Sequence, residues 1–240
     1  MKFTNIILSL MSLALLNSCS SLLPFDETEK NVSEAVEEPL TTLQTKVNTL
    51  QALPNLYKTQ TKKDKTSDQT LNQFQGALLL KQQGKLSLAR ERFIALSEQH
   101  PNLSGVWLQL ALLVKQQDND DMQQQHKDMT RYLNNAISAN PLNYLAHNEF
   151  ALVLRQQGQF QQALSHYELA IKSWPAFAVG YLNRGILYDL YMGRKSLALV
   201  DYELYQALSD DNSRQLKGWI IDLKRQIKSD QAVTQAGAML

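Results

Sequence analysis

One apolar, glutamine-rich motif returns at nearly constant spacing and constrains the fold more than any other feature of the sequence. It reads ALLLKQQG from Ala77, ALLVKQQD from Ala111 and ALVLRQQG from Ala151, and GILYDLYMG from Gly185 is a looser fourth copy. The starts are separated by 34, 40 and 34 residues. About twelve residues after three of the starts stands a further small residue: Ala89, Ala163 and Ala198. A period of this length indicates one helical hairpin per copy, stacked on its neighbours.

The pattern resembles the tetratricopeptide (TPR) repeat, in which small residues mark where two helices cross and a proline closes each unit. Gly84 and Gly158 can end the first helix of a pair through positive φ, and a proline stops the second helix. The closing prolines are Pro101, Pro141 and Pro175, and the aromatic anchors between units are Phe93, Trp107, Tyr167 and Tyr181. The resemblance implies an all-α fold, a right-handed TPR superhelix of antiparallel helix pairs, with four repeats over residues 67–212.

Two units depart from the pattern. The second is six residues longer, and the excess lies in DNDDMQ, Asp118 to Gln123. We interpret it as a longer polar turn, because a calcium loop would need a glycine and a distal glutamate that are missing here. In the fourth unit Gly193 is displaced by one residue, and Asp210-Asp211 replaces the closing proline.

A C-terminal capping helix is predicted over residues 213–229, behind Ser213 as its N-cap. Its apolar face consists of Leu216, Trp219, Ile220, Leu223 and Ile227. Solenoids need such a terminal element with a polar outer side. We expect residues 230–240 to form a frayed tail.

The N-terminus has the features of an exported lipoprotein. Lys2 precedes an apolar run from Ile6 to Leu16, which is shorter than the roughly 20 residues that cross a bilayer core. Such a run is typical of a secretory signal peptide. Leu16-Asn17-Ser18-Cys19 resembles the lipobox of bacterial lipoproteins, although Asn17 departs from the smaller residue usual there. The resemblance implies removal of residues 1–18 and acylation of Cys19, the single cysteine. The alternative is a buried free cysteine behind a leader that is cleaved elsewhere.

Ser20 and the charge balance bear on location. In the lipoprotein family, aspartate directly after the cysteine retains the protein in the inner membrane. Ser20 therefore implies the outer membrane, on the periplasmic side of a Gram-negative type envelope. The 24 basic side chains less Lys2 leave 23, equal to the 23 acidic ones. A neutral chain has no electrostatic reason to bind nucleic acid or an anionic membrane surface, so we expect membrane contact through the lipid anchor only.

Between the anchor and the repeats, the sequence predicts a linker and one helix. Residues 19–38 hold six acidic side chains between Asp26 and Glu38 against a single lysine, and few apolar ones, which indicates a flexible linker. Within residues 39–66, an amphipathic helix is expected to follow Pro39 and end near Pro54. Its apolar stripe consists of Leu40, Leu43, Val47 and Leu50. The remainder is a basic link to which we assign no function.

Motifs for catalysis or cofactor binding are missing from the sequence. It holds no Gly-rich phosphate loop, nucleophile elbow or zinc-protease motif. The four histidines never pair at metal-binding spacing on one helix: His100, His126, His147 and His166. We therefore expect no enzyme, no cofactor and no metal. Solenoids of this kind present a surface to protein or peptide partners.

The resemblance implies a lipid-anchored scaffold or adaptor that binds protein partners in the periplasm. TPR lipoproteins of the outer membrane help assemble pili or secretion pores, or gather cell-wall hydrolases. The segments from Asn183 and Lys217 also resemble repeat proteins that accompany TonB-type complexes. We expect a role in assembly or maintenance of such an envelope complex. A self-associating structural lipoprotein, a homo-oligomer paired through the helix of residues 40–53, is the alternative.

In the TPR family, the concave face is lined by first-helix side chains one turn on either side of the small residue. This rule implies a mainly apolar floor: Phe74 and Leu78, Leu108 and Leu112, Asn148 and Leu152, Leu182 and Ile186. One turn further stand Lys81, Lys115, Arg155 and Asp189. An apolar floor with a basic edge fits an amphipathic helix that carries acids on one flank. Two alternatives stay open. The aliphatic side chains could be half buried between pairs without touching a ligand, or the 40–53 helix could occupy the groove itself.

Overall fold

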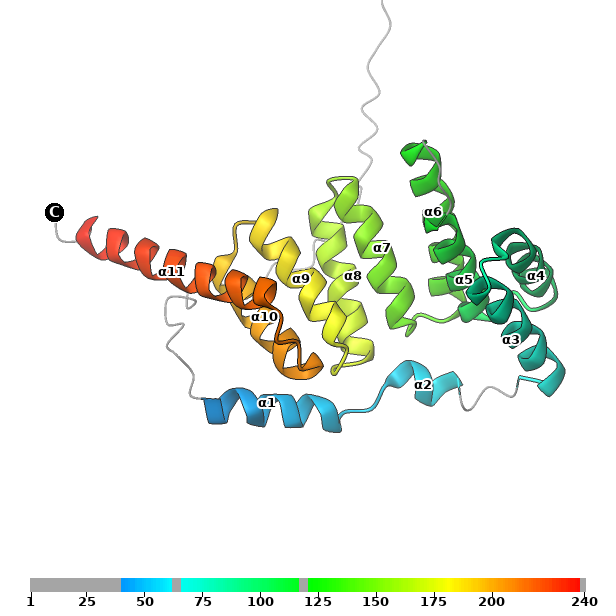
Figure 1. Cartoon of the computed structure of the whole chain (residues 1–240), viewed down its shortest axis with the longest axis horizontal. Helices are drawn as coiled ribbons and strands as arrows, with labels where there is room; N and C mark the ends of the chain where they lie inside the picture. The colour runs from blue at the N-terminus through cyan, green and yellow to red at the C-terminus, as the bar shows by residue number, and fades with distance from the viewer. Residues whose placement is uncertain (1–39, 62–65, 117–120, 238–240) are drawn as a thin grey trace, which may run out of the picture. The chain divides into compact units, whose positions relative to one another are not determined.

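The computed structural model describes residues 40–61, 66–116 and 121–237, and all regular secondary structure within these ranges is α-helical (Figure 1). The first helices are α1 (Leu40–Ala52) and α2 (Leu56–Thr61). Eight helices follow: α3 (Asp68–Gln82), α4 (Leu86–Gln99), α5 (Ser104–Lys115), α6 (Met122–Ala139), α7 (Tyr144–Gln156), α8 (Phe160–Ser173), α9 (Ala178–Leu190) and α10 (Lys195–Ser209). The last is α11 (Arg214–Gly237).

None of these described helices is both long and apolar enough to cross a membrane. Cys19, the predicted signal peptide and the acidic linker lie outside the described residues.

The eight central helices form four pairs, α3–α4, α5–α6, α7–α8 and α9–α10. The second helix of each pair also packs against the first helix of the next pair. We call α3, α5, α7 and α9 the A helices, and their partners the B helices. The arrangement confirms the predicted TPR fold, and the divergent fourth unit packs its two helices together like the others.

Small residues lie where the helices of a pair cross, as predicted. Ala77, Ala89, Ala151 and Ala163 are all buried. In the fourth pair the small residue is Gly185, and a Cβ at this position would lie 2.8 Å from the ring of Tyr202. Heavy atoms do not approach so closely, so the tyrosine ring on α10 requires a glycine opposite it on α9.

Glycine turns end three of the A helices. Gly84 and Gly158 have φ of 74° and 75°, which confirms their predicted positive φ. Gly193 has φ of 64° and forms the equivalent turn, displaced by a single residue in its unit. Asp210, which stands in the predicted place of a closing proline, ends α10 in the left-handed region with φ of 55°. Aspartate tolerates this conformation better than most residues, so the unit closes without proline.

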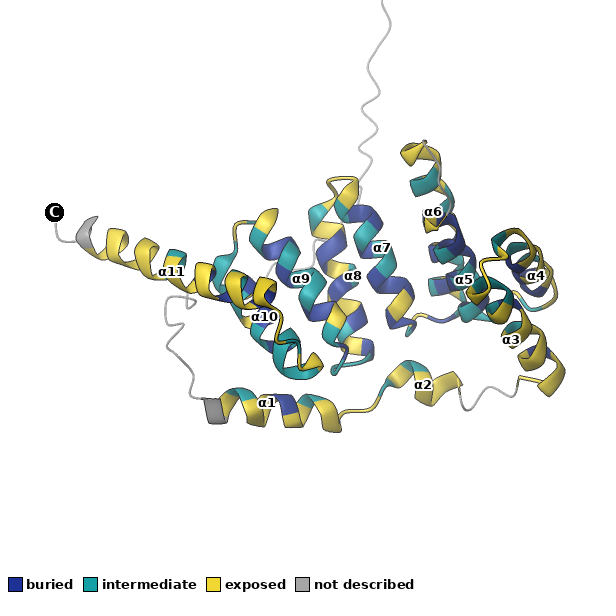
Figure 2. Ribbon diagram, in the orientation of Figure 1, coloured by how far each residue is buried: buried dark blue, intermediate teal, exposed yellow. Residues whose placement is uncertain are grey.

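The two largest hydrophobic clusters of the described residues meet at α7. Ala146 and Val153 of α7 belong to the cluster of the first two pairs. Ala151 and Leu154, on another side of the same helix, belong to the cluster of α7–α11. Figure 2 shows buried positions on α7 and on the helices beside it. The helix α7 therefore couples the two halves of the array mechanically.

The helix α11 covers the last pair, as the capping prediction requires. Leu216, Ile220 and Leu223 are buried against the cluster that contains Tyr202, and Ser213 Oγ accepts a hydrogen bond from the Leu216 amide. Trp219 stands 34 residues after Gly185, where a further repeat would need a small residue. Its indole packs instead against the ring of Tyr202 on α10, with the ring centroids 5.5 Å apart.

One C-terminal expectation is wrong. The helix does not fray after Ser229 but continues to Gly237. Lys195 Nζ lies 2.8 Å from Asp230 Oδ2, so an ion pair connects the extension to the start of α10. Sequence periodicity misses this contact, because the extension beyond Ser229 is held by charge and has no apolar stripe.

The N-terminal helix α1 packs on the array. Val47 is buried against Tyr181 of α9 and Leu204 of α10, with Leu43 and Leu50 of the same stripe around it. None of the twelve residues predicted to line the groove belongs to this cluster. Leu43, Val47 and Leu50 of the apolar stripe are therefore engaged with α8, α9 and α10 within the chain.

The segment after α1 is more ordered than the basic link that the sequence predicts. Residues Leu56–Thr61 form α2, whose Tyr57 ring meets the Tyr144 ring with centroids 6.1 Å apart. Tyr144 in turn contacts Trp174 and Phe177, at 5.0 and 4.8 Å between ring centroids. A six-residue helix is too short to show a period, but Asn55 caps its start by accepting a hydrogen bond from the Lys58 amide at 2.9 Å.

Candidate partner-binding surface

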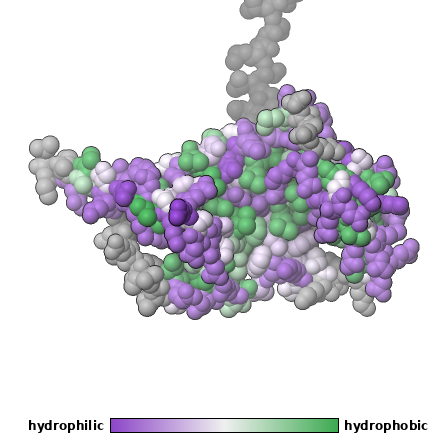
Figure 3. Space-filling model, in the orientation of Figure 1, coloured by the Kyte–Doolittle hydropathy of each residue, from purple (hydrophilic) through white to green (hydrophobic). Residues whose placement is uncertain are grey.

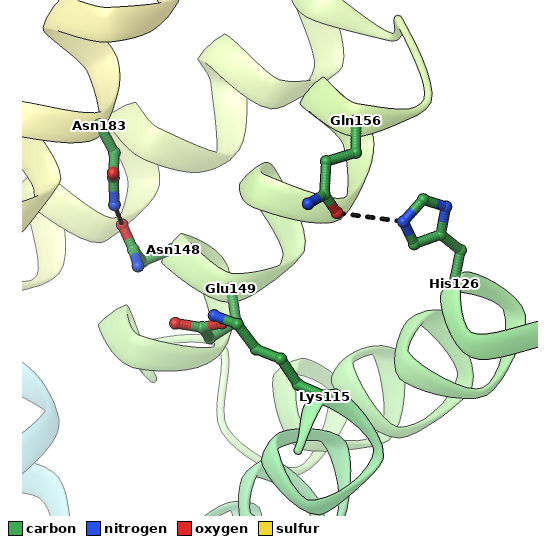
Figure 4. Close-up of polar contacts among 6 residues, drawn as sticks. All are labelled: Lys115, His126, Asn148, Glu149, Gln156 and Asn183. Carbon is green, nitrogen blue, oxygen red and sulfur yellow. Dashed lines mark hydrogen bonds and ion pairs between the residues drawn. The ribbon is translucent and has the colours of Figure 1, made fainter. Parts of the chain in front are cut away.

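All twelve predicted binding residues lie on the A helices, but they are not equally accessible. Leu108 and Asn148 are buried, which is a correction to their predicted role as ligand contacts. Leu108 belongs to the core of the first two pairs. The Oδ1 atom of Asn148 accepts a hydrogen bond from Asn183 Nδ2 at 2.8 Å, across to α9 (Figure 4). The other apolar members are half buried: Phe74, Leu78, Leu112, Leu152, Leu182 and Ile186.

A more exposed apolar row lies one turn nearer the start of each A helix, and the sequence reasoning missed it. Leu71, Leu145 and Val179 are 47%, 38% and 43% exposed. Each stands six residues before the small residue of its repeat, and Gly105 holds that place in α5. The same repeat register could therefore have found them. We call this row together with the twelve predicted residues the A-helix face.

Apolar side chains of this region are visible at the surface. Figure 3 shows hydrophobic side chains gathered in the middle of the displayed face, where α7 to α9 lie in Figure 1. Side chains three or four residues apart share one side of a helix. Val179 and Leu182, for example, therefore present one apolar strip on α9.

The predicted basic edge is largely engaged within the protein. Lys81 Nζ donates to Gln109 Oε1 at 2.9 Å, and burial lowers the pKa of Lys81. Lys115 Nζ forms an ion pair of 2.9 Å with Glu149 of α7 (Figure 4). Both contacts join one A helix to the next. Of the two lysines, only Lys115 is paired with a negative charge.

The remaining two edge residues contact tyrosines. The guanidinium carbon of Arg155 lies 5.8 Å from the ring centroid of Tyr191. Asp189 Oδ2 accepts a hydrogen bond of 3.3 Å from the Tyr202 hydroxyl. Arg155 lies in the third repeat and Asp189 in the fourth. The side-chain charge along the edge therefore changes from positive to negative between these two repeats, as predicted.

The long turn of the second unit is flanked by polar contacts. Residues 117–120 lie outside the described residues, but Asp121 caps α6 by accepting a hydrogen bond from the Gln124 amide at 2.9 Å. His126 Nε2 lies 3.0 Å from Gln156 Oε1, across to α7 (Figure 4). Within the described ranges, no three His, Cys, Asp or Glu side chains come together in a way that could hold a metal ion.

Two histidines pair between α7 and α8. His147 Nε2 lies 2.9 Å from the Pro141 carbonyl oxygen, so this nitrogen carries the proton and donates it. His147 Nδ1, left as an acceptor, lies 2.9 Å from Nδ1 of His166. Burial lowers the pKa of His147, and burial together with the neighbouring His147 lowers the pKa of His166 to about 4.

We expect this pair to make the third repeat sensitive to acid. The unfolded pKa of histidine is about 6.5 and the folded value is lower, so protonation favours unfolding. The contribution of the histidine pair to the free energy of unfolding is complete above pH 6.5 and is lost as the pH falls towards 4. Allowing for partial exposure, the loss is about 1–2 kcal/mol, or several degrees in melting temperature. The measurement is the melting temperature of the protein and of His166→Gln between about pH 7.5 and 4.5.

The variant His166→Gln should show a flatter profile than the parent protein over this range. The matched control is His126→Gln, because the ring of His126 contacts the amide of Gln156 and not a second imidazole. Identical profiles for the parent protein and His166→Gln would contradict the assignment.

Comparison with solved structures agrees with this architecture. The MamA protein of Desulfovibrio magneticus RS-1, from position 41 to its end, superposes with a TM-score of 0.55 and 12% sequence identity, over 73% of this chain and 94% of that one. A tetratricopeptide repeat protein from Parabacteroides merdae ATCC 43184 gives 0.53 and 15% identity, over 68% of this chain and 62% of that one. No protein-family model and no curated protein sequence matches the chain. The chain therefore has a TPR fold.

Proposed function

We propose that the chain is a scaffold that binds protein partners through the A-helix face. The observation that carries this proposal is the exposed row of Leu71, Leu145 and Val179, which recurs at one position of three repeats. Large apolar side chains that stay exposed at one recurring position favour an interaction surface. Since Lys115 is already paired with Glu149, we infer a partner that contributes mainly apolar side chains and little negative charge.

The proposal extends to a lipid tether on Cys19 and a periplasm-facing position at the outer membrane. Its support is the lipobox resemblance of Leu16 to Cys19 and the serine that follows. Two or more acyl chains anchor a protein stably. An envelope complex, whether for pilus or secretion assembly, cell-wall maintenance or TonB-type energy transfer, is the proposed setting of the scaffold.

The test of partner binding is site-specific photocrosslinking in intact cells. A photoreactive residue at Val179 or Leu145 should capture the same partner from both positions. The matched control is Leu169 on the B helix α8, which is 42% exposed against 43% for Val179. Equal capture from Leu169 would show that the contact is not specific to the A-helix face.

The test of the tether is Cys19→Ser. This change removes the thiol that acylation needs, so labelled palmitate should no longer enter the protein, which should accumulate as precursor or in the soluble periplasmic fraction. Ser21→Ala leaves the lipobox unchanged and should behave like the parent chain. Normal processing and outer-membrane fractionation of Cys19→Ser would refute the lipoprotein proposal.

A further inference from the structure

A cavity of about 190 Å³ lies between α2 and the first two repeats. Its lining includes Tyr57 of α2, Leu71 and Phe74 of α3, and Gly105 of α5. Leu71, Phe74 and Gly105 also belong to the A-helix face or to its exposed row. The cavity therefore opens where α2 meets the first two A helices.

One repeat lacks, beside the cavity, a side chain that the other three carry. Gly105 holds the position of Leu71, Leu145 and Val179 in their repeats. A Cβ at Gly105 would lie 3.7 Å from Phe74 Cζ and 3.8 Å from the Tyr57 hydroxyl oxygen, which is ordinary van der Waals contact. A Cβ at this position would thus fit against the rings of Phe74 and Tyr57, which both line the cavity.

The described residues that line the cavity are a mixture of apolar and uncharged polar ones, and several of the polar groups already have partners within the protein. Ser104 Oγ donates to the Ala136 carbonyl at 2.7 Å and accepts from Asn143 Nδ2 at 2.7 Å. Thr70 Oγ1 lies 3.2 Å from His100 Nε2. No Asp, Glu, Lys or Arg is among the described residues that line the cavity. A charged group placed there would lose its hydration without gaining a partner, which is strongly unfavourable.

The volume accommodates a group about the size of a single side chain. Sites for drug-sized molecules and cofactors measure about 300–1,000 Å³. An apolar cavity of about 150 Å³, by contrast, holds a benzene molecule. The cavity therefore has room for one phenyl ring or one branched aliphatic group.

We propose that this cavity binds one uncharged apolar side chain, of leucine or phenylalanine size, from a polypeptide that lies on the A-helix face. The inference rests on the proposed function and adds to it the identity of one anchor residue. The side chain of the partner lies beside Gly105, the one position of this row that has no side chain of its own.

The probes for the test are N-acetyl-leucinamide and N-acetyl-phenylalaninamide, with N-acetyl-glutaminamide as the polar control. Binding to the full-length ¹⁵N-labelled protein is followed through the amide resonances of Leu71 and Gly105. We expect saturable shifts with dissociation constants of the order of 1–10 mM for the two apolar probes. Glutaminamide should leave these resonances unchanged.

The deciding variant is Gly105→Leu, which fills the cavity and should weaken both apolar probes by roughly tenfold or more. The control is Gly218→Leu on α11, where a Cβ would meet nothing within 4 Å, and it should bind like the parent protein. Leu71→Gln, at an exposed wall position, supplies a second test if Gly105→Leu perturbs α5, and it should also weaken binding.

Three results would overturn the inference: no saturable shift with either apolar probe, equal shifts with the glutamine derivative, or unchanged binding by both cavity variants. None of them removes the proposed function by itself, because crosslinking from Val179 reports on the A-helix face independently. If Val179 gives no crosslinks but the apolar probes still bind to the cavity, the proposed function is refuted and the apolar specificity of the cavity is not.

Discussion

Replacing Asp201 with alanine is expected to lower the free energy of unfolding by about 3–5 kcal/mol, because it leaves a largely buried guanidinium without its partner. Arg184 Nε and Nη2 donate to the two carboxylate oxygens of Asp201, each at 2.8 Å. Asp201 is 2% exposed, and the guanidinium lies 5.6 Å from the ring centroid of Tyr181 and 5.7 Å from that of Tyr188. The melting temperature should fall by about 10 °C for a chain of this size.

The control for Asp201→Ala lies on the same helix. Glu203 pairs with Lys224 of α11 at 2.8 Å, but both side chains are partly exposed, at 28% and 55%. Exposed pairs contribute about 0–1 kcal/mol, so Glu203→Ala should lower the melting temperature only slightly. Equal losses from the two substitutions would contradict a buried pair between α9 and α10.

A double substitution separates the charge from the space it occupies. Buried ion pairs replaced by apolar residues of similar volume are often neutral or stabilising. Arg184→Met combined with Asp201→Leu should therefore recover most of the stability that Asp201→Ala loses. The recovery would also agree with the repeat register, since Leu110 and Phe150 hold the position of Arg184 in the second and third units.

The fold could be predicted because its determinants are local and repeat in the sequence. Ala77, Ala111 and Ala151 mark one register, and Gly84 and Gly158 mark the turn that follows. Each unit repeats the same short-range contacts, so a few residue types at fixed offsets specify a helix pair. The divergent fourth unit was recognisable through Gly185, although the reason for glycine there, the ring of Tyr202, is visible only in three dimensions.

The surface was harder to predict because exposure depends on what the next pair covers. Leu108 and Leu112 have equivalent places in the repeat rule, yet the core of the first two pairs buries only Leu108 completely. Asn148 is likewise buried, and its side chain is hydrogen-bonded to Asn183 of the following A helix. The binding face therefore depends on contacts between repeats, which a rule written for one repeat does not contain.

Contacts between distant segments were beyond sequence reasoning for a related reason. Tyr57 packs on Tyr144 across 87 positions of the chain, and no period connects them. His147 and His166 are 19 residues apart on the two helices of one pair. That pair was in principle accessible, because the 34-residue register defines which positions of the two helices face each other.

Replacing Ala151 with leucine is the second large effect that we expect. Ala151 is fully buried at the crossing of α7 and α8, in one cluster with Ala163, Tyr167 and Leu187. Three added carbon atoms have no space there, and overpacking typically costs about 1–3 kcal/mol. Because α7 contributes to both hydrophobic clusters, the loss should spread to neighbouring pairs, as nearest-neighbour coupling in solenoids predicts. Thermal unfolding measured by far-ultraviolet circular dichroism tests this expectation.

The control for Ala151→Leu is Ala95→Leu, which makes the same chemical change at an exposed position of α4. Alanine and leucine have similar helix propensities, so the two variants differ mainly in packing. Ala95→Leu should leave the melting temperature nearly unchanged, whereas Ala151→Leu should lower it by several degrees. If the two variants have the same melting temperature, the helices of the third pair do not cross at Ala151. The register shared by Ala77, Ala111, Ala151 and Gly185 would then no longer explain how the units pack.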